Sequence, residues 1–261
     1  MKIAIFYNSR TNPKHRAYAT EISKILDRYN LKYFLNPSET DFKKIELAIT
    51  AGGDGTVLYA ANLLAKFNVP ILGINFGHRG FLCEVQKKEN IEEVVKKIVE
   101  GDYKIEEKTR IQAEIKKQDK SITSLNALNE ISIGGINRTV YLSTEISIGK
   151  KSLKVKIVGD GLIVATRTGS TAYNINAGGP MLLTEALSVV ANNAFFESSI
   201  LVSVTRSLVV PSETIIRVND LSHNADNLPF VIADGQKSLK IGKEDIVIIK
   251  KAKERNYFMK F

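Results

Sequence analysis

The sequence predicts an α/β amino-terminal domain with a parallel sheet, followed by a β-rich carboxy-terminal domain. Strand and helix patterns alternate through the first hundred residues, which favours a parallel sheet covered by helices. From about Tyr103 the apolar period changes from that of a helix to two, the pattern of half-buried antiparallel strands. With 261 residues, the chain is long enough for two small domains, each with its own core.

The first domain is predicted to contain strands and helices in alternation. Four short apolar runs predict strands: Lys2–Tyr7, Leu31–Leu35, Leu47–Thr50 and Ile71–Ile74. Three stretches with apolar residues at helical spacing predict helices: Arg16–Tyr29, Thr56–Phe67 and Ile91–Glu100. Asn90 can cap the last of these helices, and Gly101 can end it.

The second domain is predicted to consist mainly of strands. Alternation of apolar and polar residues marks three of them: Ile111–Ile115, Thr139–Ile148 and Ser152–Val158. One helix is predicted, Met181–Asn192, introduced by the break Gly178-Gly179-Pro180.

Composition excludes several classes of protein. The single cysteine, Cys83, cannot form a disulfide within the chain, which excludes a disulfide-stapled secreted domain, and its apolar neighbours indicate a buried, inert thiol. Net charge is +9, but the lysines are dispersed, which is not the pattern of a nucleic-acid-binding face. No signal peptide and no membrane-spanning stretch is recognisable. We therefore expect a cytoplasmic protein with no nucleic-acid or membrane partner.

The most distinctive short motif is Gly52-Gly53-Asp54-Gly55-Thr56, between a predicted strand and a predicted helix. Its glycines lack the Cβ atoms that would keep a phosphate away, and the helix directs its positive dipole end to the same place. A carboxylate at this position can accept a proton from an attacking hydroxyl or hold a metal ion. The motif is neither a P-loop nor a dinucleotide fingerprint. Taken alone, it is more often a simple Asp-Gly turn.

Two further segments carry polar groups suited to a nucleotide or its sugar, and a third segment forms a turn. Asn129-Glu130 offers an amide and a carboxylate to sugar hydroxyls, if a bend or strand end brings both side chains to one ligand. The run Gly159–Asn174 leads from an apolar strand into a hydroxyl- and glycine-rich bend with one aromatic ring. Asp234-Gly235-Gln236 is typical of a hairpin turn. Taken singly, an Asn-Glu pair is more often an exposed surface pair without a functional role, and a Ser/Thr-rich loop can simply be solvated.

The three histidines do not predict a metal site. His15, His78 and His223 lie far apart, and none has a second ligand at helical or turn spacing, which argues against bound zinc. His78 could approach a phosphate, although a loop histidine without a role is the simpler interpretation.

Taken together in this order, the segments resemble the NAD kinase family. The similar segments cover most of the chain: Gly52–Thr56, Gly73–Leu82, Asn129-Glu130, Asp160–Pro180 and Asp234–Gln236. The first is the least specific, because diacylglycerol and sphingosine kinases and 6-phosphofructokinases look similar there. The Asn-Glu pair combined with the Thr-Gly-Ser-Thr-Ala-Tyr run is much more specific.

The resemblance implies an enzyme that transfers the γ-phosphoryl group of ATP to the 2′-hydroxyl of the adenosine ribose of NAD. It implies Asp54 as the catalytic base and a divalent cation, Mg²⁺, carried with ATP. It implies a dinucleotide site formed by eleven residues: Gly55, Asn129, Glu130, Asp160, Thr171, Ala172, Tyr173, Asn174, Ile175, Asn176 and Gln236.

The resemblance also has implications for architecture and assembly. It implies a first domain at 1–103, a sandwich-like second domain at 104–245, and a last segment, 246–261, that returns to the first domain. It implies a homo-oligomer, dimer or tetramer, in which Asp160 reaches the active site of a neighbouring subunit. Two positions depart from the family pattern: Val158, where many bacterial members have Arg, and Arg79, where an apolar residue is usual.

Two other functions are compatible with parts of the pattern. A lipid kinase of the diacylglycerol or sphingosine type would need an apolar acceptor groove and a membrane-facing surface, and the sequence has no strongly amphipathic basic helix. A non-catalytic dinucleotide-binding protein could keep the pocket, but binding alone would not require the carboxylate of Asp54.

Overall fold

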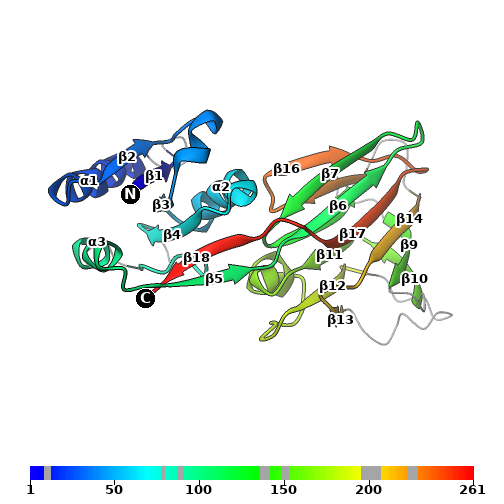
Figure 1. The fold of residues 1–261 in the computed structure, drawn as a ribbon. Coiled ribbons are helices and arrows are strands. Elements are labelled where there is room, and N and C mark those ends of the chain that lie inside the picture. Colours follow the sequence, from blue (N-terminus) through cyan, green and yellow to red (C-terminus); the bar gives the residue numbers. More distant parts are fainter. Residues whose placement is uncertain are drawn as a thin grey trace. The chain divides into compact units, whose positions relative to one another are not determined.

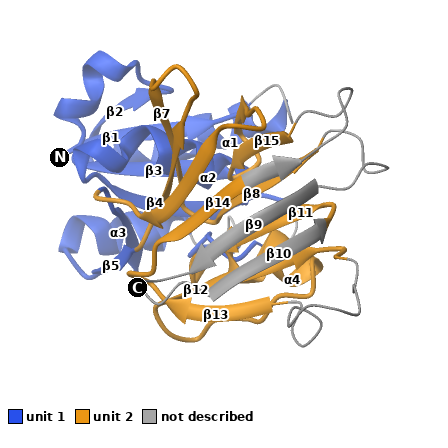
Figure 2. Cartoon of the chain, turned by 90° about the vertical axis from the view of Figure 1, so that its right-hand side faces the viewer, with its two compact units in different colours: residues 1–108, 254–261 blue, residues 109–253 orange. Residues whose placement is uncertain are grey.

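The computed structural model describes residues 1–8, 13–77, 80–86, 91–135, 142–148, 153–194, 207–222 and 229–261. The chain divides into two compact units (Figure 2). Unit 1 comprises Met1–Lys108 and Glu254–Phe261, and unit 2 comprises Thr109–Lys253.

Unit 1 contains a six-stranded sheet in the order β2-β1-β3-β4-β18-β5 (Figure 1). Its strands are β1 (Lys2–Tyr7), β2 (Lys32–Leu35), β3 (Leu47–Gly52), β4 (Pro70–Asn75), β5 (Lys104–Lys108) and β18 (Asn256–Lys260). All neighbours pair in parallel except β5, which is antiparallel to β18 at the sheet edge. The central strand β3 is buried along its whole length, as expected for a parallel strand covered on both faces.

Helices cover both faces of this sheet. The longer elements are α1 (Lys14–Arg28), α2 (Asp54–Leu64) and α3 (Ile91–Glu100), and two short 3₁₀ helices are η1 (Glu39–Lys44) and η2 (Ala65–Phe67). Ile5 of β1 packs in a core with apolar residues of α1 and α3. The ring of the next residue, Phe6, contacts Tyr59 of α2 and Phe42 of η1. Because successive strand residues face opposite ways, α2 lies on the face opposite α1 and α3.

Unit 2 is built from two antiparallel six-stranded sheets, in the orders β10-β9-β14-β17-β6-β7 and β13-β12-β11-β8-β15-β16. The first contains β6 (Ile111–Lys116), β7 (Ile122–Ala127), β9 (Leu142–Ile148), β10 (Leu153–Gly159), β14 (Ile216–Ser222) and β17 (Ile246–Lys251). The second contains β8 (Glu130–Gly135), β11 (Gly161–Ala165), β12 (Ala186–Asn192), β13 (Ser207–Pro211), β15 (Pro229–Ala233) and β16 (Lys237–Lys240). A short 3₁₀ helix, η4 (Thr168–Thr171), and a single turn, α4 (Tyr173–Asn176), follow β11.

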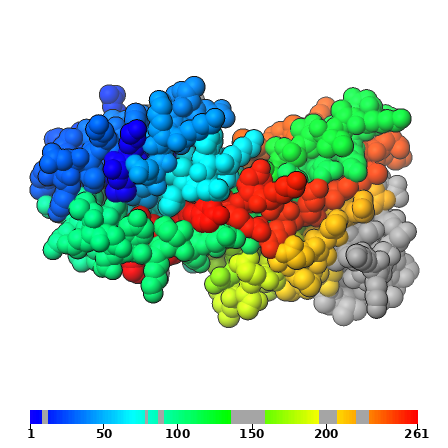
Figure 3. Space-filling model, in the orientation of Figure 1, coloured from blue at the N-terminus to red at the C-terminus, as the bar shows by residue number. Residues whose placement is uncertain are grey.

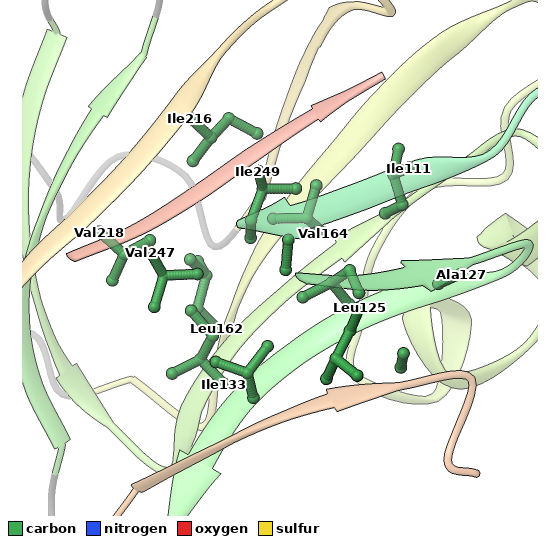
Figure 4. Close-up of a cluster of buried hydrophobic side chains, with 14 of the residues drawn as sticks. Ile111, Leu125, Ala127, Ile133, Leu162, Val164, Ile216, Val218, Val247 and Ile249 are labelled. Atoms are coloured by element: carbon green, nitrogen blue, oxygen red, sulfur yellow. The ribbon is translucent and has the colours of Figure 1, made fainter. Parts of the chain in front are cut away.

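A shared apolar core holds the two sheets of unit 2 together. Side chains from β6, β7, β14 and β17 meet side chains from β8 and β11 between the sheets (Figure 4). Side chains from β12 and β15 belong to the same core. In β6, Ile111, Ala113 and Ile115 are fully buried while Gln112 and Glu114 are half-buried. This alternation is the pattern of a sandwich strand with one face toward the core.

The architecture confirms the predicted fold class, a parallel-sheet α/β domain and a β-rich, sandwich-like second domain. The predicted first-domain strands and helices correspond to β1–β4 and α1–α3, with small differences at their ends. In the second domain, Ile111–Ile115 lies in β6, and the described parts of Thr139–Ile148 and Ser152–Val158 lie in β9 and β10. The expected cap Asn90 lies outside the described residues.

The helix predicted at Met181–Asn192 was wrong. Ala186–Asn192 forms β12, which pairs with β11 and β13 in the interior of its sheet. Alternate residues of β12 face the sandwich core, but Ser188 and Val190 between them are buried as well. A strand buried on both faces loses the alternation that distinguishes it from a helix.

The expected domain boundaries also need correction. β5 (Lys104–Lys108) belongs to the sheet of unit 1, because it pairs with β18. The expectation that all of 246–261 returns to the first domain was wrong for β17, which pairs with β6 and β14 of unit 2. Only the last segment, with β18, joins unit 1, where it lies between β4 and β5 (Figures 1 and 3).

Candidate active site

Asp54 lies at the point where the strand order of the unit 1 sheet reverses. The chain moves from β1 to β2 on one side and from β3 to β4 on the other, so that β1 and β3 are neighbours at the reversal. Ligands of such sheets bind at the carboxyl ends of the strands beside this point. β3 ends at Gly52, Gly53 caps α2, and Asp54 is the first residue of the helix. The motif Gly52–Thr56 therefore joins the end of β3 directly to the first turn of α2 and is not a free loop.

Backbone N–H groups of the segment after β4 hold the carboxylate of Asp54. The N–H of Phe81 donates to Oδ2 at 2.9 Å and the N–H of Leu82 donates to Oδ1 at 3.1 Å. Gly80 packs directly on the same carboxylate, because a Cβ atom at Gly80 would lie 2.3 Å from Oδ1. The carboxylate is thus fixed in orientation, and it is only partly exposed. Oδ2 retains a further lone pair for a substrate proton or cation, whereas Oδ1 also accepts from the thiol of Cys83.

The segment that holds Asp54 is itself fastened to β4. Val85 exchanges hydrogen bonds with the strand, accepting from the N–H of Asn75 at 2.8 Å and donating to the carbonyl of Gly73 at 3.1 Å. The amide of Gln86 donates to the carbonyl of Cys83 and accepts from the side chain of Asn75 at 3.1 Å. These bonds explain how Phe81 and Leu82 can position a carboxylate that lies 27 and 28 residues earlier in the chain.

Cys83 lies beside this carboxylate and is not a nucleophile. It is 6% exposed, and its Sγ is 3.9 Å from Oδ1 of Asp54. Burial, and secondarily the negative charge of Asp54, raise the pKa of the thiol to about 12. The thiol is therefore protonated at neutral pH, in agreement with the inert role predicted from the sequence.

In unit 2, Asn129 and Glu130 are buried at the start of β8. The carboxylate of Asp234 accepts hydrogen bonds from three successive backbone N–H groups: Leu128 at 2.9 Å, Asn129 at 2.7 Å and Glu130 at 3.3 Å. In return, the N–H of Asp234 donates to the carbonyl of Glu130 at 3.1 Å. Asp234 is itself 6% exposed.

Thr166, just after β11, holds the same segment by donating hydrogen bonds to the carbonyl groups of Leu128 and Asn129. The hydroxyl of Thr166 donates to the carbonyl of Leu128 at 2.6 Å and accepts from the N–H of Gly169 at 3.1 Å. The N–H of Thr166 donates to the carbonyl of Asn129 at 2.8 Å. Gly169 approaches so closely that a Cβ atom there would lie 2.1 Å from the carbonyl oxygen of Asn129. Only glycine fits at this position.

The side chains of Asn129 and Glu130 keep hydrogen-bonding capacity for a ligand. Oδ1 of Asn129 and Oε2 of Glu130 are buried and have no partner among the described residues. Burial, and secondarily the negative charge of Asp234, raise the pKa of Glu130 to about 7. The carboxyl group is then about half protonated at neutral pH, so it can both donate to and accept from a sugar hydroxyl.

The turn after β11 is fixed by buried polar groups. Asn174 is fully buried and donates to the carbonyls of Ser170 and Pro180, both at 2.9 Å. The hydroxyl of Ser170 accepts from the N–H of Leu182 at 3.0 Å. Asn174 therefore shapes the turn, and only its Oδ1 atom lacks a partner among the described residues. Thr171 and Ala172 are half-buried in this turn, and Ile175 is 43% exposed on α4.

Three of the predicted residues line one pocket of about 330 Å³ in unit 2: Asp160, Tyr173 and Asn176. Ser132 of β8 also lines it, on the sheet face opposite Ile131 and Ile133, which point into the core. Two asparagines at the end of β12 organise its rim. The amide of Asn192 donates to the hydroxyl of Tyr173 at 3.1 Å, and that of Asn193 donates to Asp160 at 3.2 Å.

The predicted residues thus fall into separate groups. Asp54 and Gly55 belong to unit 1, and the other ten belong to unit 2. Gln236 is exposed in the β15–β16 hairpin, where Asp234 and Gly235 both have positive φ, as expected for an Asp-Gly turn. His78, Arg79 and His223 lie outside the described residues, and nothing is described of the side chain of Val158. The residues that sequence reasoning missed are Asp234, Thr166 and Gly169, whose contacts with Asn129 span 37 to 105 residues.

No three His, Cys, Asp or Glu side chains in the described ranges gather in a way that could hold a metal ion. None of the described helices is long and apolar enough to cross a membrane.

Comparison with known proteins agrees with the sequence pattern. The ATP-NAD kinase N-terminal domain matches residues 8–103, and the ATP-NAD kinase C-terminal domain matches residues 128–261. An NAD kinase of Caldanaerobacter subterraneus is 34% identical over 221 residues, which are 84% of this chain and 75% of the relative. An NAD kinase of Aquifex aeolicus is 33% identical over 239 residues, which are 89% of this chain and 84% of the relative.

Solved structures show the same fold. An NAD kinase from Archaeoglobus fulgidus in complex with ATP superposes with a TM-score of 0.79 and 29% identity, covering 99% of this chain and 93% of that one. Yeast NADH kinase complexed with NADH gives a TM-score of 0.86 at 21% identity, covering 100% of this chain and 83% of that one. The two matched domains, the relatives and the shared fold lead to one conclusion: the chain belongs to the NAD kinase family.

Proposed function

We propose that this chain transfers the γ-phosphoryl group of ATP to the 2′-hydroxyl of the adenosine ribose of NAD, and that Asp54 accepts the proton of that hydroxyl. The family match spans both units, and relatives that share about a third of their residues with this chain are NAD kinases. Family membership therefore favours NAD as the acceptor over a lipid.

The observation that carries the mechanism is the fixed carboxylate of Asp54. Two backbone N–H groups, of Phe81 and Leu82, set its orientation at the first turn of α2. A base held in one orientation can accept a proton as the hydroxyl oxygen attacks phosphorus, which typically contributes about 10²–10⁴-fold to the rate. Phosphoryl transfer otherwise depends mainly on positioning and charge neutralisation.

We assign NAD binding to the predicted residues of unit 2. The buried oxygens of Asn129 and Glu130 suit the hydroxyls of a ribose, because each needs a hydrogen-bond partner that the described residues do not supply. Tyr173 offers an aromatic plane at the rim of the pocket that Asp160 and Asn176 also line. Gly55 and Gln236 are exposed and therefore accessible to a substrate.

The divalent cation, Mg²⁺, is expected to enter with ATP as part of the substrate. It would neutralise charge on the phosphates, which a carboxylate such as Asp54 would otherwise repel. The lone pair that Oδ2 of Asp54 keeps beside its backbone hydrogen bond is compatible with a neighbouring cation.

A test of acceptor choice separates the proposed function from its alternatives. Purified protein supplied with ATP and Mg²⁺ is expected to convert NAD to NADP and to leave diacylglycerol unmodified. NADP is measured enzymatically and lipid phosphate by thin-layer chromatography. Phosphorylation of the lipid without NADP would establish a lipid kinase, and NAD binding without any product would establish a non-catalytic protein.

We further propose that the chain works in the cytoplasm as a homo-oligomer, dimer or tetramer, with Asp160 serving the site of a neighbouring subunit. Co-expression of an Asp54→Asn chain with an Asp160→Ala chain tests this, after each variant alone is shown to be assembled and nearly inactive. In mixed dimers one of the two sites is intact, so about a quarter of all sites should regain activity. Activity no higher than the average of the two variants would contradict shared sites.

A further inference from the structure

The buried segment Leu128–Glu130 is held in place by the side chains of Asp234 and Thr166. Neither residue is among those that we assign to NAD binding. Every backbone polar group of Leu128 and Asn129 is hydrogen-bonded to Asp234 or Thr166. The backbone of Glu130 is bonded to Asp234 on both its N–H and its carbonyl. We call this set of contacts, from Asp234 on one side and Thr166 on the other, the clamp.

We propose that Asp234, assisted by Thr166, is a positioning residue that aims the side chains of Asn129 and Glu130 at NAD. This rests on the proposed function of the chain and deepens it. The segment joins β7 to β8, and at such a joint the backbone would otherwise be free to adopt several conformations. The clamp fixes one conformation without using the side-chain oxygens Oδ1 of Asn129 and Oε2 of Glu130, which stay available in a buried place.

The local geometry shows why an aspartate performs this role. Its carboxylate has two acceptor oxygens and no donor, and both oxygens face backbone N–H groups: Oδ2 faces Leu128, and Oδ1 faces Asn129 and Glu130. Its backbone has φ of 50°, a left-handed conformation that Asp and Asn tolerate better than most residues. The hairpin turn and the clamp therefore depend on the same residue.

The matching substitution is Asp234→Asn. Asparagine keeps the size of the side chain and tolerates the positive φ, but one oxygen becomes an NH₂ group that must face a backbone N–H. The variant loses a charge-assisted hydrogen bond, and its NH₂ group places one donor opposite another. This should release Leu128–Glu130 from its fixed conformation, so we expect NAD affinity to fall about 10-fold or more. The KM for ATP is expected to change little.

Asp245→Asn is the matched control. Asp245 is a second buried carboxylate of unit 2, 5% exposed, and it accepts from the N–H of Gly242 at 2.8 Å and from Lys117 at 2.7 Å. Its hydrogen-bond partners among the described residues are Gly242 and Lys117 and not Leu128–Glu130, so its substitution carries the same chemical change without loosening the clamp. We expect it to lower stability while the affinity for NAD stays at the wild-type value.

The experiment measures NAD binding by calorimetry without ATP, and then the KM for NAD and for ATP, in wild type and each variant. Calorimetry does not depend on turnover, so absence of kinase activity in the wild type would refute the proposed function separately. Weaker NAD binding in folded Asp234→Asn, with normal binding in Asp245→Asn, supports the clamp. Unchanged NAD binding in Asp234→Asn, or an equal loss in both variants, would overturn it.

Thr166 keeps the proposal testable if Asp234→Asn does not fold. Thr166→Val has nearly the same shape but cannot donate to the carbonyl of Leu128, whereas Thr166→Ser keeps the hydroxyl. Weaker NAD binding in Thr166→Val, with binding restored in Thr166→Ser, supports the clamp. Wild-type NAD binding in folded Thr166→Val would contradict it.

Discussion

Replacing Asp54 by Asn is expected to lower kcat by about 10²-fold or more while NAD binding stays nearly intact. Asparagine has the shape of aspartate but cannot accept the proton of the attacking hydroxyl. The variant also loses part of one hydrogen bond, because its NH₂ group must face the N–H of Phe81 or Leu82. We therefore expect a moderate loss of stability in addition, on the order of 1 kcal/mol.

Steady-state kinetics and NAD binding by calorimetry, on protein shown to be folded by circular dichroism, check this result. Asp41→Asn serves as the control, because Asp41 is also an acid of unit 1, but its carboxylate accepts hydrogen bonds from Ser38 and Lys44 and not from the segment that holds Asp54. It should retain the wild-type kcat. A folded Asp54→Asn enzyme with near-normal kcat would remove Asp54 from the chemical step.

Replacing Gly169 by Ala is expected to damage the NAD site by displacing its backbone. The added Cβ atom would lie 2.1 Å from the carbonyl oxygen, 2.3 Å from the carbonyl carbon and 2.6 Å from the Cα atom of Asn129. None of these backbone atoms can turn away as a flexible side chain would, so η4 and the start of β8 must move apart. We expect a stability loss of about 1–3 kcal/mol, as for other overpacked sites. NAD affinity should fall with it.

Gly242→Ala is the matched control for this prediction. A Cβ atom at Gly242 would lie 3.8 Å from the nearest atom, the carboxylate of Asp245, which is an ordinary van der Waals contact. Thermal unfolding and NAD calorimetry should therefore show a large change for Gly169→Ala and a small one for Gly242→Ala. If Gly169→Ala bound NAD as the wild type does, the close approach to Asn129 would not be required.

Much of unit 1 could be predicted because its signals are local. β1, α1, β3 and α3 each carry their own apolar pattern, and the glycines around Asp54 mark the start of α2. The position of Asp54 at the strand end followed from this pattern. The groups that hold its carboxylate could not be predicted from the sequence. They are backbone N–H groups of a segment that is fastened to β4 by backbone hydrogen bonds, which any sequence could make.

The missed features of unit 2 depend on contacts between distant residues. β12 resembled a helix because both of its faces are buried, so that no alternation remained to identify a strand. Asp234 resembled an ordinary turn residue, since its positive φ and the following glycine suit a hairpin. Its carboxylate contacts Asn129 across 105 residues, and no local pattern encodes such a contact.

Phosphorus-31 NMR of the product formed from NAD, ATP and Mg²⁺ locates the transferred phosphate directly. The proposed reaction predicts a new phosphomonoester coupled to the proton on the 2′-carbon of the adenosine ribose, and its formation should slow by about 10²-fold in Asp54→Asn. A phosphate on any other hydroxyl, or equal rates in the two proteins, would contradict the assignment of Asp54 as the base that acts on this hydroxyl.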